Sequence, residues 1–135
     1  MQAVHNFGPT SANTFKCALF TAAGTIGPTT TVYTPGMTGE VSSSGTGYTE
    51  GGNTLVISQS PTSGNNLAGI PTAYISFQNT SWPNANFTAR GALIYKAGAN
   101  GAICVLDFGN DKTSSSTFTV QMPADTASAA LIRLV

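Results

Sequence analysis

The side chains that could carry out chemistry are few and widely spaced in this sequence. Glu40 and Glu50 flank one glycine-rich stretch and form the best available pair for glycoside hydrolysis, which needs two carboxylates in one cleft. Loop acids are far more often solvated, or paired with a cation such as Arg90 or Lys96. His5 is the only histidine, so any Ser-His-Asp triad would have to recruit it. We therefore expect no catalytic residues and no enzymatic activity.

The candidate metal and phosphate motifs are also incomplete. The run from Asp107 to Asp111 lacks the alternating ligands and the distal Glu of a calcium loop, and a strand end followed by a turn is the simpler interpretation. Residues 45–47 read Gly-Thr-Gly but lack the Lys-Ser/Thr of a phosphate loop. Cys17 and Cys104 are too few for a zinc site, and we interpret them as buried thiols. We expect no metal and no cofactor.

Composition narrows the choice of partners. The 135 residues carry five cations and five anions, and charged residues make up 7% of the chain, against roughly 25% in an ordinary domain. A neutral chain lacks the basic footprint of a nucleic-acid binder. No apolar run approaches the ~18 residues of a membrane span, and the first nine residues do not resemble a signal peptide. So little charge fits a subunit that is built into an assembly.

The strongest structural pattern is a hairpin over residues 84–108. Its first strand has an apolar side made of Phe87, Ala89, Leu93 and Tyr95. Alternate side chains of a strand point to opposite faces, so Arg90 and Lys96 should face water or a neighbouring subunit. The step Asn100-Gly101 favours a tight turn because both residues tolerate positive φ. We expect the core to include Phe87, Leu93, Tyr95, Cys104 and Leu106.

The rest of the chain reads as short strands separated by turns. Strands are expected at residues 14–20, 30–34, 53–58, 72–77, 117–122 and 129–135. Polar loops or turns are expected at 22–29, 39–52, 59–69, 79–83 and 109–115, and one short helix could form at 10–11 or 123–128. This pattern predicts an all-β fold, an antiparallel β-sandwich of jelly-roll or Ig-like type with about eight strands. We expect an N-terminal arm over 1–13 and a single sandwich domain over 14–135.

Arg90 is the most informative charged residue, because it lies mid-strand between Ala89 and Gly91. Such small neighbours allow another chain to approach, and Arg is enriched at protein–protein contacts. An outward side chain on a solvent face is the equally weighted alternative. The other candidate interface residues are Lys96, Glu40, Tyr48 and Glu50.

Five segments carry a resemblance to a known family. They are Thr34 with residues 39–52, then Trp82 with residues 87–95, residues 105–112, residues 118–121 and residues 130–133. Over roughly residues 15–135 the chain resembles a family of small tailed-bacteriophage structural proteins.

The resemblance implies a non-enzymatic virion component, most plausibly a capsid decoration (cement) protein on the particle surface, assembled in the host cytoplasm. Its implied partners are the major capsid protein or other virion proteins, in a homo-oligomer for which a trimer is one candidate state. A tail, adaptor or fibre-attachment component is the first alternative. The second is a carbohydrate-binding or hydrolytic β-sandwich that uses Trp82, Tyr48, Glu40 and Glu50.

Overall fold

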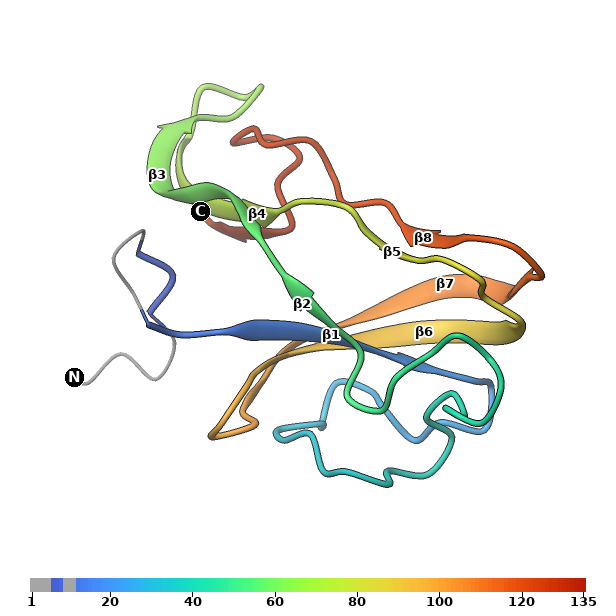
Figure 1. Cartoon of the computed structure of the whole chain (residues 1–135). Coiled ribbons are helices and arrows are strands. Elements are labelled where there is room, and N and C mark those ends of the chain that lie inside the picture. Colours follow the sequence, from blue (N-terminus) through green and yellow to red (C-terminus); the bar gives the residue numbers. More distant parts are fainter. Residues whose placement is uncertain (1–5, 9–11) are drawn as a thin grey trace. The chain divides into compact units, whose positions relative to one another are not determined.

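A computed structural model describes residues 6–8 and 12–135, which form nine β-strands and no helix (Figure 1). The strands are β1 (Phe15–Phe20), β2 (Asn53–Leu55), β3 (Ile57–Asn65), β4 (Pro71–Phe77), β5 (Thr80–Trp82), β6 (Phe87–Lys96), β7 (Ala102–Ser114), β8 (Phe118–Val120) and β9 (Ile132–Leu134). The predicted all-β class is confirmed, with several antiparallel sheets; the sandwich type and the strand count stay predictions.

Contacts divide the chain into two compact units. Unit 1 comprises Met1–Asn13, Leu55–Asn79 and Val120–Val135; unit 2 comprises Thr14–Thr54 and Thr80–Thr119.

The main sheet of unit 2 has the strand order β2-β1-β6-β7. The predicted hairpin forms one end of this sheet: β6 pairs antiparallel with β7, and Tyr95 stands opposite Ala102. Asn100 in the connecting turn has φ of 57°, as expected for an Asn-Gly step. β1 lies antiparallel on the other side of β6, with Phe15 opposite Lys96 and Phe20 opposite Gly91. The hairpin therefore has a neighbouring strand, β1, on the β6 side only, and β7 forms an edge of the sheet.

β7 runs past the turn that the sequence predicted at residues 109–115. Its pairing with β6 continues to Ser114, with a register shift between the Gly91–Asp107 and Ala89–Lys112 pairs. The polar run after Asp107 is therefore a bulge inside a long edge strand. The prediction of a turn there was wrong because cross-strand pairing outweighs the weak strand propensity of Gly, Asn and Asp.

The two strands of the hairpin are buried to different degrees. Phe87, Leu93 and Tyr95 lie in the core as predicted. Ala92 and Ile94, on the opposite side of β6, are fully buried as well. Cys104 and Leu106 are only half-buried, because they belong to the edge strand β7.

A long irregular segment, residues 21–52, covers the face that carries Leu93 and Tyr95. Tyr33 joins their cluster with Ala18 and Phe20, and Ile26 and Met37 pack against it. The strand predicted at residues 30–34 is reduced to one bridge between Val32 and Gly101. That bridge lies on the outer side of β7. The strand prediction therefore contained a residue that pairs, but it overestimated how many residues take part in the pairing.

The turn predicted at residues 79–83 is a strand instead. β5 pairs with β8 in a two-stranded sheet, and Asn53 Nδ2 donates to the Ser81 carbonyl oxygen and to Thr80 Oγ1. Trp82 is only 2% exposed and packs edge-on to Phe118, with ring centroids 6.2 Å apart. Trp82 is thus a core residue of unit 2.

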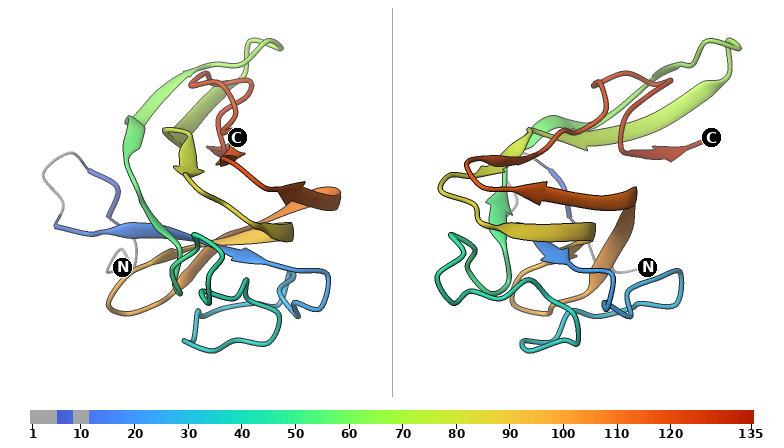
Figure 2. Two further views of the ribbon diagram at one scale, coloured as in Figure 1. Left: turned by 45° about the vertical axis from the view of Figure 1, so that its right-hand side comes forward. Right: turned by 90° about the vertical axis from the view of Figure 1, so that its right-hand side faces the viewer.

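Unit 1 contains a three-stranded antiparallel sheet in the order β3-β4-β9 (Figures 1 and 2). The loop predicted at residues 59–69 was wrong over most of its length, because β3 continues to Asn65 and pairs with Pro71. The polar side chains of β3 gave no strand signal, and its pairing with β4 imposes the conformation.

No helix forms at 123–128; residues 10–11 lie outside the described range. Phe7, in the predicted arm, packs edge-on to Phe77 at 6.3 Å between ring centroids.

Candidate functional site

The carboxylate of Glu40 is the most heavily hydrogen-bonded side chain that the sequence singled out. Its Oε1 accepts from the hydroxyl of Tyr48 and from the amide of Gly51, both at 2.7 Å. Its Oε2 accepts from the hydroxyl of Tyr33 at 3.0 Å. The Tyr48 hydroxyl in turn accepts from the amide of Leu19 in β1 at 3.1 Å. Glu40 therefore ties distant parts of the covering segment together, and Tyr48 links them to the sheet.

Tyr95 completes this arrangement from the sheet side. Its ring stacks on that of Tyr33, 4.3 Å between centroids, and its hydroxyl donates to the carbonyl oxygen of Gly51 at 2.8 Å. Burial raises the pKa of Tyr95 to about 12, with the charge of Glu40 adding to the shift. Burial and the bond to Glu40 also raise the pKa values of Tyr33 and Tyr48. These hydroxyls stay protonated as donors, a structural role rather than that of a general base.

The predicted interface residues of the covering segment differ in accessibility. Tyr48 is 3% exposed, so its ring lies inside unit 2 and not on an accessible surface. Glu50 is exposed and accepts from the amide of Gly36 at 2.7 Å. Buried rings offer no face for stacking on a sugar, so the placement of Tyr48 and Trp82 gives the carbohydrate-binding alternative no support. Lys96 is half-buried at the end of β6, opposite Phe15.

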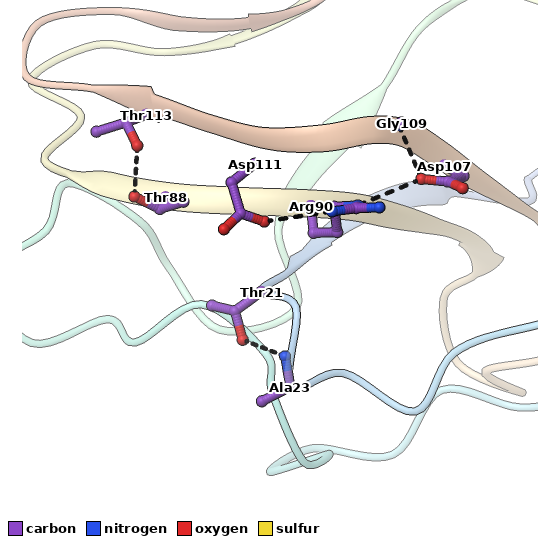
Figure 3. A network of polar contacts seen from close by, with 8 residues as sticks. All are labelled: Thr21, Ala23, Thr88, Arg90, Asp107, Gly109, Asp111 and Thr113. Carbon is purple, nitrogen blue, oxygen red and sulfur yellow. Dashed lines mark hydrogen bonds and ion pairs between the residues drawn. The ribbon is translucent and has the colours of Figure 1, made fainter.

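Arg90 lies over the bulge of β7 (Figure 3). Its Nε is 3.7 Å from Oδ1 of Asp107 and its Nη1 is 3.9 Å from Oδ1 of Asp111. Asp107 Oδ1 also accepts from the amide of Gly109, the local backbone contact that the sequence suggested for this run. The Arg90 side chain is 43% exposed, which leaves it accessible to a neighbour while its charge is balanced within the strand pair. Its role as an interface anchor stays a prediction.

The two cysteines lie on one face of the sheet and are both free thiols. Cys17 stands opposite Ile94, which stands opposite Cys104, so a whole strand separates them. Burial raises the pKa of Cys17 to about 12 and that of Cys104 to about 11. Within the described ranges no group of three or more His, Cys, Asp or Glu residues could hold a metal ion, and His5 lies outside those ranges.

Among the described residues there is no helix that could span a membrane.

A different kind of surface, which sequence reasoning missed, belongs to unit 1. Six large apolar side chains are exposed in the described part of the chain, and five of them belong to this unit: Val56, Leu67, Ile70, Leu134 and Val135. Only two of the ten charged residues, Asp125 and Arg133, belong to the same unit. Apolar exposure without charge is typical of a contact surface.

Leu67 is the most exposed of these side chains, at 97%. It lies in the turn between β3 and β4, where Oδ1 of Asn66 accepts from the amides of Ala68 and Ile70 at 2.9 and 3.1 Å. The amide of Leu67 itself donates to Oγ of Ser128 at 2.8 Å. The backbone is thus held in place while the side chain points into solvent, which lowers the ordering cost of burying it in a contact.

A second exposed apolar side chain, that of Leu134, lies on strand β9 of the sheet. It stands opposite Ala73 of β4 in the pairing with β9, and it is 72% exposed. Directly opposed residues project on the same face, so Leu134 and the exposed Ala73 lie side by side. A signal for this surface existed in the sequence: Leu55–Asn79 contains no Asp, Glu, Lys or Arg, although it was expected to form a polar loop in part.

Comparison with known proteins gave no match to a family model, to a curated protein or to a solved structure.

Proposed function

We propose that this chain is a non-enzymatic structural protein of a bacteriophage virion, a capsid decoration protein that binds the major capsid protein and stabilises the shell. The family follows from the resemblance noted in the sequence. One observation above all supports the contact role. In unit 1, which carries little charge, hydrogen bonds fix the backbone of the turn between β3 and β4 while the side chain of Leu67 stays exposed.

Burial of such side chains supplies the binding energy in this proposal. Burying an exposed Leu side chain contributes roughly 1.5–3 kcal/mol. A few such contacts per copy give weak binding to one capsid subunit. In a shell the contacts repeat over many copies, and they favour the assembled state because they form only there.

The copy number in purified virions tests this function. Quantitative mass spectrometry of virions from the phage that encodes this chain should give a copy number comparable with that of the major capsid protein. Density for the chain should lie on the outer surface of the capsid in a virion map.

Other outcomes would redirect or remove the proposal. Recovery only with isolated tails, at the copy number of a tail ring, would support the tail or adaptor alternative and contradict the cement role. Absence of the chain from purified virions would overturn the proposal as a whole.

A further inference from the structure

Unit 2 contains a groove of about 790 Å³ beside the edge strand of its main sheet. One wall comes from the end of β1, which contributes Phe20, and from the covering segment, which contributes Ile26 and Pro28. The opposite wall is Ile103–Asp107 of β7. The volume lies within the range of ligand-binding clefts. Most of the lining is apolar, and its one ion pair, Arg90 with Asp107, is internally balanced.

The wall formed by β7 is the edge of a sheet. Five consecutive residues of this strand line the groove, and Arg90 and Gly91 of the neighbouring inner strand β6 line it beside them. β7 has no neighbouring strand on its outer side among the described elements, apart from the bridge at Val32. A strand edge presents a row of backbone donors and acceptors that can pair with another chain.

The chain itself already uses the first part of this edge in that way. The amide of Tyr33 donates to the carbonyl oxygen of Asn100 at 2.8 Å, and the amide of Ala102 donates to that of Thr31 at 2.9 Å. The groove follows directly, along Ile103–Asp107. These two hydrogen bonds show that the edge accepts antiparallel backbone pairing.

Both ends of the groove wall are closed by the protein's own structure. The bridge at Val32 lies at one end, and the bulge clamped by Arg90 lies at the other (Figure 3). The stretch between them is about 17 Å long at the rise of a β-strand. That length suits a short extended segment, and it is too short for the whole β7 strands of two copies to pair edge to edge.

We propose that this groove binds a short, extended and uncharged segment of another protein chain, added as a strand beside Ile103–Asp107. Backbone hydrogen bonds to β7 would supply the pairing, and alternate apolar side chains of the segment would pack against Phe20, Ile26 and Pro28. The proposal concerns unit 2 alone and stands whether or not unit 1 is a capsid-binding surface.

An end-capped heptapeptide of alternating threonine and valine serves as the probe, added to the full chain. We expect saturable binding and slower hydrogen exchange of alternate amides within Ile103–Asp107. N-methylation of the probe at alternate amides removes its donors without removing its side chains. We expect affinity for the N-methylated probe to fall at least about tenfold, and a probe with glutamate in place of valine to bind equally poorly.

Variants locate the binding. Ile103→Lys places a charge in the groove and should abolish binding, whereas Asn110→Lys, on the same strand but outside the lining, should leave it unchanged. Hydrogen exchange of the wild-type chain gives an answer even if Ile103→Lys fails to fold. No binding, binding that N-methylation does not weaken, or protection located elsewhere would each overturn the proposal. Leu67→Lys should not affect the probe, which separates this result from the fate of the proposed function.

Discussion

The two units use their side chains in opposite ways. Unit 2 holds eight of the ten charged residues, and its Glu40 and tyrosine hydroxyls are hydrogen-bonded within the unit. Unit 1 has almost no charge and exposes Leu67 and Leu134 to solvent. The residues that suggested chemistry in the sequence thus stabilise a fold, while a stretch without chemically distinctive residues exposes apolar side chains. Substitutions of the buried and internally hydrogen-bonded residues of unit 2 should therefore change stability, and those of the exposed apolar side chains of unit 1 should change assembly.

The largest effect on stability is expected at Gly52 in unit 2. Its φ is +73°, and a Cβ there would lie 1.7 Å from the carbonyl oxygen of Cys17. Gly52→Ala should lower the free energy of unfolding by at least about 3 kcal/mol, since the backbone of β1 would have to move. Gly36→Ala is the matched control, with φ of +75° and open space around the added methyl group, and it should cost only about 1–2 kcal/mol. Denaturant unfolding measures both, and equal losses would contradict the close approach.

The next effect concerns the Glu40 carboxylate. Glu40→Gln replaces one acceptor oxygen with a donor that faces tyrosine hydroxyls or the Gly51 amide, and it should cost about 1–3 kcal/mol. Glu50→Gln, at an exposed carboxylate with one backbone partner, should change the free energy of unfolding by less than about 1 kcal/mol. If the two variants were equally stable, the Glu40 carboxylate would not hold the parts of the covering segment together.

Alkaline pH should destabilise unit 2 through its buried hydroxyl and thiol groups. The pKa of Tyr95 is raised to about 12, and that of Cys17 also to about 12. The folded state therefore holds these protons more tightly than the unfolded chain, whose Cys and Tyr side chains titrate near 8.5 and 10. The free energy of unfolding should be constant at neutral pH and fall as pH rises from about 8.5 to 12. Denaturant unfolding along a pH series measures this slope, and Tyr95→Phe should reduce it above pH ~10; a flat profile would contradict the burial of these groups.

A small effect is expected at Arg90, although it lies at the centre of the sheet of unit 2. Its partners Asp107 and Asp111 are solvent-exposed, and such ion pairs contribute about 0–1 kcal/mol. Arg90→Ala should therefore leave thermal unfolding nearly unchanged, with Lys112→Ala as a control on the same bulge. A large loss of stability would mean that the clamp on the bulge holds the sheet together. Weaker incorporation into virions, with stability retained, would support Arg90 as an interface anchor.

The sequence predicted those parts of the fold whose signals are local. The hairpin of β6 and β7 follows from alternating side chains and from Asn100, whose positive φ is a property of the residue itself. β3 was missed beyond Ser58 because Ser, Pro, Thr and Gly dominate that part, and its conformation comes from pairing with β4. Strand propensity is a weak guide where the partner strand decides.

The site was less predictable than the fold. Glu40 contacts Tyr33, Tyr48 and Gly51 in a segment without regular structure, and no period reveals such contacts. Arg90 was considered as a partner for Glu40 or Glu50, whereas the bulge places Asp107 and Asp111 beside it. The exposure of Leu67 depends on the turn at Asn66 and on Ser128, which is distant in sequence.

The most direct measurement of the central claim compares one substitution on each unit. Leu67→Ser and Val32→Ser each remove an exposed apolar side chain, the first from unit 1 and the second from unit 2. Both variants should unfold within about 0.5 kcal/mol of the wild-type chain, since neither side chain is in the core. The amount of each variant retained on purified virions is then measured against the wild-type chain. The claim predicts that Leu67→Ser is lost from virions while Val32→Ser is retained; retention of Leu67→Ser at the wild-type level would contradict it.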